Sequence, residues 1–460
     1  MEVIVIYTYQ DLLKVGDDEN KRMEFIQTVI ASHKNSEMYK EAVIAMEYFK
    51  HRNVTIFDYQ KLLYTISGEA VPDNFSANYK LRSNFFNRFV TQQNQFLLGN
   101  GVSLSNDGDK EKLGKDFDSR LQELGRDAII CALSFGFWNK DHTEVFTLLE
   151  FAPLWDEETG GLAAGVRFWQ IDKSKPLRAT LYELDGYTEY IWRNSIGEIY
   201  KPKRPYVLVT LEAPVGDVEI IDGINYPSFP IIPMWCNTEH QSEFVGIREQ
   251  IDAYDLIKSG FANDLDDCSQ IYWTIQNASG MDDIDLAKFI ERMKTVKAAT
   301  VDDDGARAEA HTIDVPYASR ETLLERIRND LYEDFMALDT KKIAGGAITA
   351  TQIKAAYEPI NNKADMYEYC IMDFLDRLFK IVGIDSDASF TRSIMVNAGE
   401  NVTTLIQAKE ILPDDYIVRK ILETFGDGDK TEDVLKMLQA DEFRRMSEDG
   451  SGQETDGQET

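Results

Sequence analysis

The stretch that decides the fold is Ile247–Ile275, IREQIDAYDLIKSGFANDLDDCSQIYWTI. Its apolar residues recur at intervals of three and four, which is the period of one helix face. The spacing predicts a continuous helix of about eight turns, roughly 45 Å long at 1.5 Å per residue. The opposite face carries Asp252, Asp255, Asp266 and Asp267. We therefore expect one packed apolar side and one acidic side.

Two more helical stripes follow this stretch. The first runs from Leu323 to Leu338, with Ser319 as its expected N-cap. The second is a longer helix over residues 349–382, which contains Pro359. Proline removes a backbone hydrogen bond and crowds the preceding turn, so a kink is expected there. Between the two stripes, Gly345-Gly346 predicts a flexible loop.

The chain before residue 244 has two parts of different character. Residues 20–51, 81–98 and 115–133 have helical patterns. A β-rich, mostly antiparallel region follows, because turn residues separate short runs of Val, Ile, Thr, Tyr and Trp. The expected strands are Val145–Leu149, Gly165–Gln170, Arg178–Leu184, Tyr187–Arg193 and Tyr206–Leu211. The apolar run at the N-terminus also reads as a strand, and not as a signal peptide.

Composition limits the classes of function. The 460 residues are 43% hydrophobic, enough for about two to four structural units with sizeable cores. The net charge of −31 argues against ordinary nucleic-acid binding, which depends on lysine and arginine neutralising phosphates. The sequence contains no run of about 18 apolar residues, so it predicts no membrane-spanning helix. Four widely spaced cysteines indicate free buried thiols in a reducing compartment, and the acidic end from Ser447 predicts disorder.

No motif predicts catalysis, a cofactor or a metal site. Gly345-Gly346 lacks the spacing of a phosphate-binding P-loop, so a hinge or loop is favoured. The run Asp302-Asp303-Asp304-Gly305 does not complete a calcium-binding loop, and the five histidines form no zinc-binding pair. No GxSxG elbow occurs. We expect no catalytic residue, no metal and no cofactor.

The order of elements, together with several short stretches, resembles the portal proteins of tailed phages with long non-contractile tails. The resemblance covers about Met38 to Leu405. The ordered set of matches carries it, and its most specific part is the spacing from Phe229–Asn237 through Ser242–Phe244 to Ile251–Asp255, with Ser259 and Asn263 beyond. The matching stretches are Asn78–Val102, Phe229–Asn237, Ser242–Phe244, Ile251–Asp255 with Ser259 and Asn263, and Gly345–Ala364.

The resemblance implies an α+β, mainly helical portal fold that assembles into a ring, with twelve copies in the virion. It divides the chain into named parts. These are a wing over 1–243 (helical over 1–143, β-rich over 144–243), a first stem helix over 244–279, a clip over 280–317, a second stem helix over 318–340, a tunnel loop over 341–348, a kinked wing helix and return over 349–399, a crown over 400–446 and a disordered acidic tail over 447–460.

The resemblance also implies site residues. The tunnel loop would line the DNA channel with Lys341, Lys342, Ile343, Ala344, Gly345, Gly346, Ala347 and Ile348. The acidic stem residues named above would face the channel and repel phosphate. The two lysines would either touch DNA phosphates transiently or cap the preceding helix, and capping is slightly favoured.

The expected function is a non-enzymatic portal ring at one capsid vertex, through which double-stranded DNA is packaged and ejected. Its implied partners are further copies of itself, the terminase packaging motor, a head-completion adaptor, and the major capsid and scaffolding proteins, with no membrane. The implied location is the virion, after assembly in the host cytoplasm. The alternatives are a soluble cytoplasmic enzyme with a β-rich substrate domain and a helical partner, or another virion component such as a scaffold or a connector of different fold.

Overall fold

The computed structural model describes residues 6–64, 68–73, 77–193, 196–212, 218–267, 272–276, 288, 307–311, 317–344, 350–392, 402, 405–425, 431–438 and 440. The chain divides into two compact units. The first comprises Met1–Gly346 with Ala355–Arg392, and the second comprises Ala347–Lys354 with Ser393–Thr460. Both helices and antiparallel strands occur, which confirms the expected α+β class.

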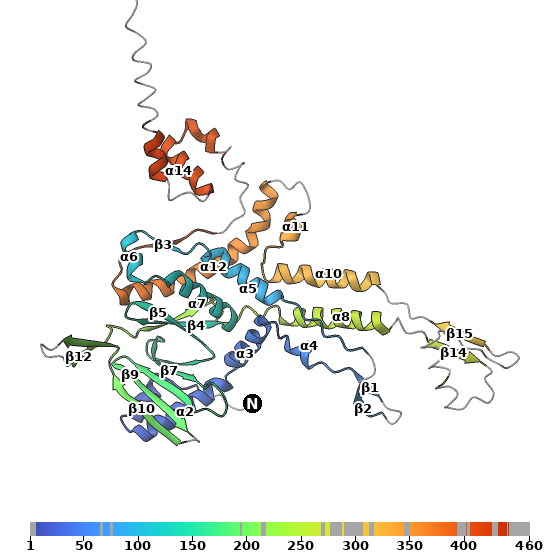
Figure 1. The fold of residues 1–460 in the computed structure, drawn as a ribbon, viewed down its shortest axis with the longest axis horizontal. Helices are drawn as coiled ribbons and strands as arrows, with labels where there is room; N and C mark the ends of the chain where they lie inside the picture. The colour runs from blue at the N-terminus through green and yellow to red at the C-terminus, as the bar shows by residue number, and fades with distance from the viewer. Residues whose placement is uncertain are drawn as a thin grey trace, which may run out of the picture. The chain divides into compact units, whose positions relative to one another are not determined.

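A helical core lies at the centre of the first unit (Figure 1). Aromatic and aliphatic side chains of α5, α7 and α12 are fully buried in it, among them Phe89, Leu124 and Phe374. Gly125 of α7 permits this close packing, because a Cβ there would meet Asn94 Oδ1 at 2.7 Å. The helices of this part are α1 (Tyr9–Val15), α2 (Glu19–Asn35), α3 (Glu37–Phe49), α4 (Val54–Asp58), α5 (Phe85–Leu98), α6 (Asp107–Lys112), α7 (Phe117–Cys131) and α12 (Ala350–Val382).

Antiparallel sheets form the β-rich part, as predicted. One sheet has the order β10-β9-β8-β7-β6, and a second has the order β13-β4-β5. The strands of this part are β4 (Leu133–Asn139), β5 (His142–Thr147), β6 (Phe151–Trp155), β7 (Leu162–Trp169), β8 (Leu177–Glu183), β9 (Gly186–Arg193), β10 (Ile196–Arg204), β11 (Val207–Glu212), β12 (Val218–Ile224) and β13 (Ile231–Trp235). Strand β4 corrects the expected boundary at residue 143. Its residues, Leu133–Asn139, belong to the part expected to be helical, but they form a strand that pairs with β13.

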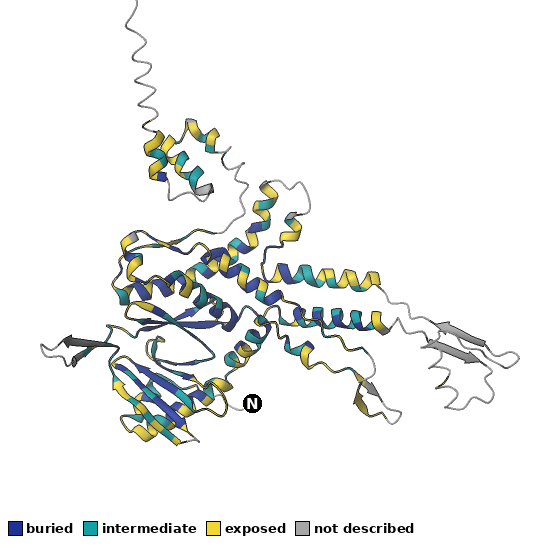
Figure 2. Ribbon diagram, in the orientation of Figure 1, coloured by how far each residue is buried: buried dark blue, intermediate teal, exposed yellow. Residues whose placement is uncertain are grey.

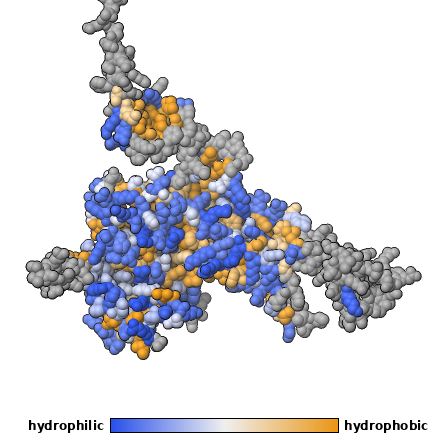
Figure 3. All heavy atoms as spheres, viewed as in Figure 1, coloured by the Kyte–Doolittle hydropathy of each residue, from blue (hydrophilic) through white to orange (hydrophobic). Residues whose placement is uncertain are grey.

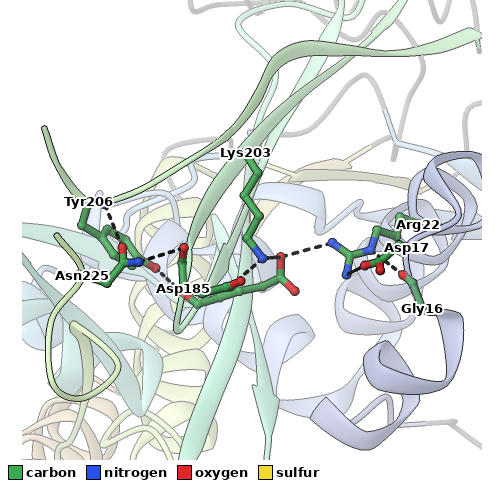
Figure 4. Close-up of polar contacts among 8 residues, drawn as sticks. Gly16, Asp17, Arg22, Asp185, Lys203, Tyr206 and Asn225 are labelled. Carbon is green, nitrogen blue, oxygen red and sulfur yellow. Dashed lines mark hydrogen bonds and ion pairs between the residues drawn. The ribbon is translucent and has the colours of Figure 1, made fainter. Parts of the chain in front are cut away.

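A buried carboxylate joins the N-terminal helices to the five-stranded sheet (Figure 4). Glu183 of β8 accepts a hydrogen bond from Arg22 of α2 at 3.2 Å, and Lys203 of β10 lies 3.0 Å away. The Tyr206 hydroxyl donates to the Glu183 carbonyl oxygen at 2.6 Å. Arg22 also donates to the Gly16 carbonyl oxygen, so one guanidinium links the loop between α1 and α2 to the sheet.

Two long helices, α8 (Arg248–Asp267) and α10 (Tyr317–Asp334), extend side by side from the core (Figure 1). The predicted eight-turn helix is wrong in length, because Tyr272–Gln276 is strand β14, paired antiparallel with β15 (Arg307–His311). The Trp-Thr-Ile run favours a strand once a partner strand is present. Ser319 does not cap α10, since that helix already begins at Tyr317.

One helix of the first unit begins later than predicted, because residues 81–84 precede α5, which starts at Phe85. Residues 1–5, which hold most of the apolar run predicted as a strand, lie outside the described residues, and Tyr9–Val15 is helical. The remaining elements are the hairpin β1 (Leu62–Tyr64) with β2 (Ala70–Pro72), the pair β3 (Val102–Leu104) with β16 (Ala388–Phe390), and α11 (Thr340–Ala344).

The predicted proline-containing helix is present as α12, which continues through Pro359. The second unit contains the 3-10 turn η1 (Ala408–Glu410), helix α14 (Asp414–Phe425) and a helical stretch over 431–438. These agree with the short helices expected near 401–446. The tail over 447–460 lies outside the described residues.

Candidate functional site

The paired helices α8 and α10 form the candidate site, and they are packed most tightly near the core. Ile251 of α8 and Leu331 of α10 are fully buried there. Further out, Arg320 pairs with Asp264, and the rings of Phe261 and Tyr317 meet edge to face at 6.0 Å. Burial falls along the pair (Figure 2). The distal apolar side chains are partly exposed, with Leu265 43%, Leu323 44% and Tyr317 54% accessible.

A ladder of polar side chains on α8 holds the extended residues 77–84, which we call the strap. Asp255 accepts from the Ser83 amide at 2.8 Å, Ser259 from the Leu81 amide at 2.9 Å, and Asn263 from the Tyr79 amide at 2.6 Å. The match is geometric. Four helical residues advance about 6 Å, and two extended residues advance about 6.6 Å, so successive rungs stay in register. The equal advance of the helix and the strap accounts for the Asp-x-x-x-Ser-x-x-x-Asn spacing.

The ladder corrects the predicted role of Asp255. Its side chain is fully buried, and it accepts hydrogen bonds from the Ser83 amide and from Asn53 Nδ2. Burial raises the pKa of this carboxyl above its ordinary value, and the hydrogen bonds only partly offset the effect. A carboxylate enclosed in this way cannot face an open channel, because the strap covers it.

The other acidic residues predicted to face a channel differ among themselves. Asp252 accepts from the hydroxyls of Tyr48 and Thr55, so it too is turned toward α3 and α4. Burial, together with the bond to Asp252, raises the pKa of Tyr48 to about 12. Asp266 is exposed near the end of α8. The side chain of Asp267 lies outside the described part of the chain. Only Asp266 therefore retains a described position compatible with an exposed acidic face.

The predicted tunnel loop begins as a helix. Lys341–Ala344 belong to α11, and Asp339 caps it by accepting from the Lys341 amide at 3.1 Å. Asp339 also pairs with Arg328 of α10 at 2.7 Å. Lys342 lies 3.4 Å from the side-chain carboxylate of Glu333 in the last turn of α10. Gly345, Gly346, Ala347 and Ile348 lie outside the described residues.

Sequence reasoning missed a largely enclosed lysine that joins three segments. Lys363 of α12 pairs with Glu243 at 2.7 Å, donates to the Phe335 carbonyl oxygen at 2.8 Å and lies 3.4 Å above the Phe335 ring. Burial lowers the pKa of this ammonium, although Glu243 opposes the shift. The available signal was its position three residues after Ile360, on the buried face of the helix. Lys363 ties α12 to the end of α10 and to the segment preceding α8.

Metal ligands, thiols and helix hydropathy complete the description of the described residues. Within them, no cluster of three or more histidine, cysteine, aspartate or glutamate side chains is arranged to hold a metal. Cys131, Cys236 and Cys370 are free thiols. Across the same described segments, none of the helices has the length and apolarity needed to cross a bilayer.

Solved structures that contain a chain similar to this one come from gene transfer agent (GTA) particles. A chain in the neck of the native particle, computed with C12 symmetry, has a TM-score of 0.43 at 10% identity and covers 73% of this chain and 89% of that one. A chain in the neck of the empty particle, computed with C6 symmetry, has a TM-score of 0.44 at 10% identity. It covers 73% of this chain and 88% of that one.

Sequence relatives give the family. A portal protein of Clostridium phage phiCD119 is 27% identical over 203 residues, which are 42% of this chain and 45% of the relative's length. A portal protein of Bacillus phage SPP1 is 22% identical over 419 residues, covering 83% of this chain and 79% of the relative. The family model described as "Phage portal protein, SPP1 Gp6-like" matches residues 29–442. The resemblance noted in the sequence is thereby confirmed, and the chain belongs to the SPP1 Gp6-like family of phage portal proteins.

Proposed function

We propose that this portal protein assembles as a ring of twelve copies at one capsid vertex, and that DNA enters and leaves through the ring. The observation that carries the proposal is the helix pair α8–α10, whose distal apolar residues are partly exposed in the single chain. A lateral neighbour would bury these residues, and a closed ring satisfies the same contact for every copy. The family match supports this architecture.

The parts of the chain take their roles from this arrangement. Helix α8 and helix α10 form the stem, residues 280–317 the clip, residues 341–348 the tunnel loop and residues 400–446 the crown. The remaining N-terminal and β-rich parts, together with α12, form the wing. The clip would contact the packaging motor and later the head-completion adaptor, and the outer wing would meet capsid and scaffolding proteins.

The charge of the chain supports a channel that conducts DNA without gripping it. Each copy carries −31, so twelve copies carry roughly −370 formal charges, which repel nearby phosphate within a Debye length. Asp255 and Asp252 contribute little to that field, because they are enclosed by the strap, α3 and α4. The repulsion therefore comes from exposed carboxylates. The subunit acts as a structural conduit, and a separate motor supplies the energy.

Electron microscopy of the purified full-length protein tests the ring directly. Class averages viewed down the symmetry axis should have twelve or thirteen subunits around an open channel. A uniform monomer or small dimer at all protein and salt concentrations would contradict the proposal.

Deleting Ala344–Ala347 tests the loop separately. The shortened protein should still form rings, but DNA packaging or retention should fall in an in vitro packaging assay with the cognate motor. Normal packaging by this variant would remove the role proposed for the loop.

A further inference from the structure

Beside the bases of α8 and α10 lies a cavity of about 370 Å³ with an unusual charge. We call it the basic pocket. Its cationic lining residues come from five separate segments: the strap, α5, the two stem helices and α11. The five cations that line it are Arg82, Arg88, Lys258, Arg328 and Lys341. No carboxylate lines this pocket among the described residues. Such a concentration is unexpected in a chain with 80 acidic and 49 basic residues.

The partners of these cations are mostly neutral. Arg88 donates to the Tyr332 hydroxyl at 3.0 Å, Arg82 donates to the His51 carbonyl oxygen at 3.3 Å, and Lys258 lies 5.8 Å from the centre of the Tyr254 ring. Arg328 alone of the five is paired with a carboxylate in the described part of the chain, that of Asp339.

The pocket is therefore suited to an anion. Like charges gathered around a concave space repel one another, and an incoming negative group gains attraction from several of them at once. Phe85 and Tyr254 form apolar walls of the pocket, and Asp255 holds the Ser83 amide. Lys258 and Arg328 are half-buried, whereas Arg82, Arg88 and Lys341 are exposed.

The adjoining surface distinguishes between possible anions. A second hollow shares Tyr254, Arg328 and Lys341 with the basic pocket, but Glu321 and Glu325 also line it. A polyphosphate backbone lying across both hollows would meet these carboxylates, whereas a single carboxylate needs only the basic pocket. The face of the first unit seen in Figure 3 is mostly hydrophilic, with apolar patches toward the helix pair. Apolar patches beside a charged pocket are typical of a protein–protein contact.

We propose that the basic pocket receives a carboxylate side chain from a second copy of this chain. The inference rests on the proposed ring, and it answers a difficulty of that ring. Copies that each carry −31 repel one another laterally unless positive groups are placed where they meet. Four of the five cations in the pocket have no carboxylate partner among the described residues, and they lie beside the partly exposed stem helices, where they would supply that attraction at the contact.

Carbodiimide crosslinking of mixed isotopic rings tests the contact. Rings are assembled from equal amounts of light and ¹⁵N-labelled protein, treated with a zero-length carboxyl-to-amine reagent and digested for mass spectrometry. Lys258 or Lys341 should appear in peptides that join a light chain to a heavy one. If rings form but both lysines remain uncoupled or couple only within one chain, the inference is wrong and the ring proposal stands. If the wild type forms no rings, the ring proposal itself fails.

A charge-reversal pair provides the second test. Arg88→Glu with Lys258→Glu should raise the protein concentration needed for half-assembly by about tenfold or more, measured by sedimentation velocity at low salt. The matched control is Lys173→Glu with Lys175→Glu, which changes the charge equally in an exposed loop and should assemble as the wild type does. Unchanged assembly of the Arg88/Lys258 variant, with loss of binding to a short DNA duplex instead, would assign the pocket to phosphate and overturn the inference.

Discussion

Removing the Asp255 carboxylate should release the strap from α8. In Asp255→Ala the Ser83 amide loses its acceptor, while Asn53 Nδ2 keeps its bond to the Ser83 carbonyl oxygen at 3.1 Å. An orphaned buried amide costs about 1–3 kcal/mol. Burial raises the pKa of this carboxyl, so a buried charge there is unfavourable, and removing it offsets part of the loss. We expect local opening of the strap to become easier by about 2 kcal/mol, or about 30-fold.

Hydrogen exchange followed by mass spectrometry measures this opening directly. Peptides that contain the amides of Tyr79, Leu81 and Ser83 should exchange about 30-fold faster in Asp255→Ala, whereas peptides from the β-rich part should be unchanged. Ser259→Ala removes one hydrogen bond to a backbone amide, so it should accelerate exchange by only about fivefold, for a loss of about 1 kcal/mol.

The matched control is Glu249→Ala, which removes an exposed carboxylate from the first turn of the same helix. Its strap should exchange at nearly the wild-type rate. The reasoning is refuted if Asp255→Ala keeps its native circular dichroism spectrum and its strap amides exchange within about twofold of the wild type. The ladder would then not be what holds the strap.

Three further changes test the core. Lys363→Ala should destabilise the protein by about 3 kcal/mol in urea unfolding, because Glu243 is left buried without its partner, and the loss should be clearly smaller in a Glu243→Gln background. Gly125→Ala should lower the melting temperature despite its better helix propensity, since the new Cβ clashes with the Tyr367 hydroxyl; an unchanged melting temperature would contradict this packing. Burial raises the pKa of Asp127 to about 6, whereas its pKa in the unfolded chain is about 3.9. The folded state therefore gains stability from the protonated carboxyl below about pH 3.9, and it loses this stability as the pH rises through about 6. Asp127→Asn should therefore be more stable than the wild type by up to about 2 kcal/mol at pH 7.5, and the gap in melting temperature should narrow at pH 5.

The secondary structure of the stem was only partly predictable from its local pattern. The three-and-four spacing correctly predicted helices at α8 and α10, but it continued through Tyr272–Gln276, which is a strand. A short apolar run fits either period, and the antiparallel partner β15 decides between them. Strand β4 was also missed; it pairs with β5, which follows directly along the chain, and with β13, which lies about a hundred residues away.

The candidate site divides in the same way. The sequence by itself determined the family, the helix pair, the proline-containing helix and the spacing of Asp255, Ser259 and Asn263. It could not determine that this spacing faces inward, because a polar side chain on a helix is ordinarily solvated and only the strap supplies its partners. Only the tertiary structure decided which charged side chains are enclosed and which lie together in the basic pocket. It buried Asp255, enclosed most of the Lys363 side chain, and brought Arg88 and Lys258, distant in sequence, to one pocket. Periodicity reports which face of an element is apolar, whereas charge clustering depends on contacts between segments that no local pattern encodes.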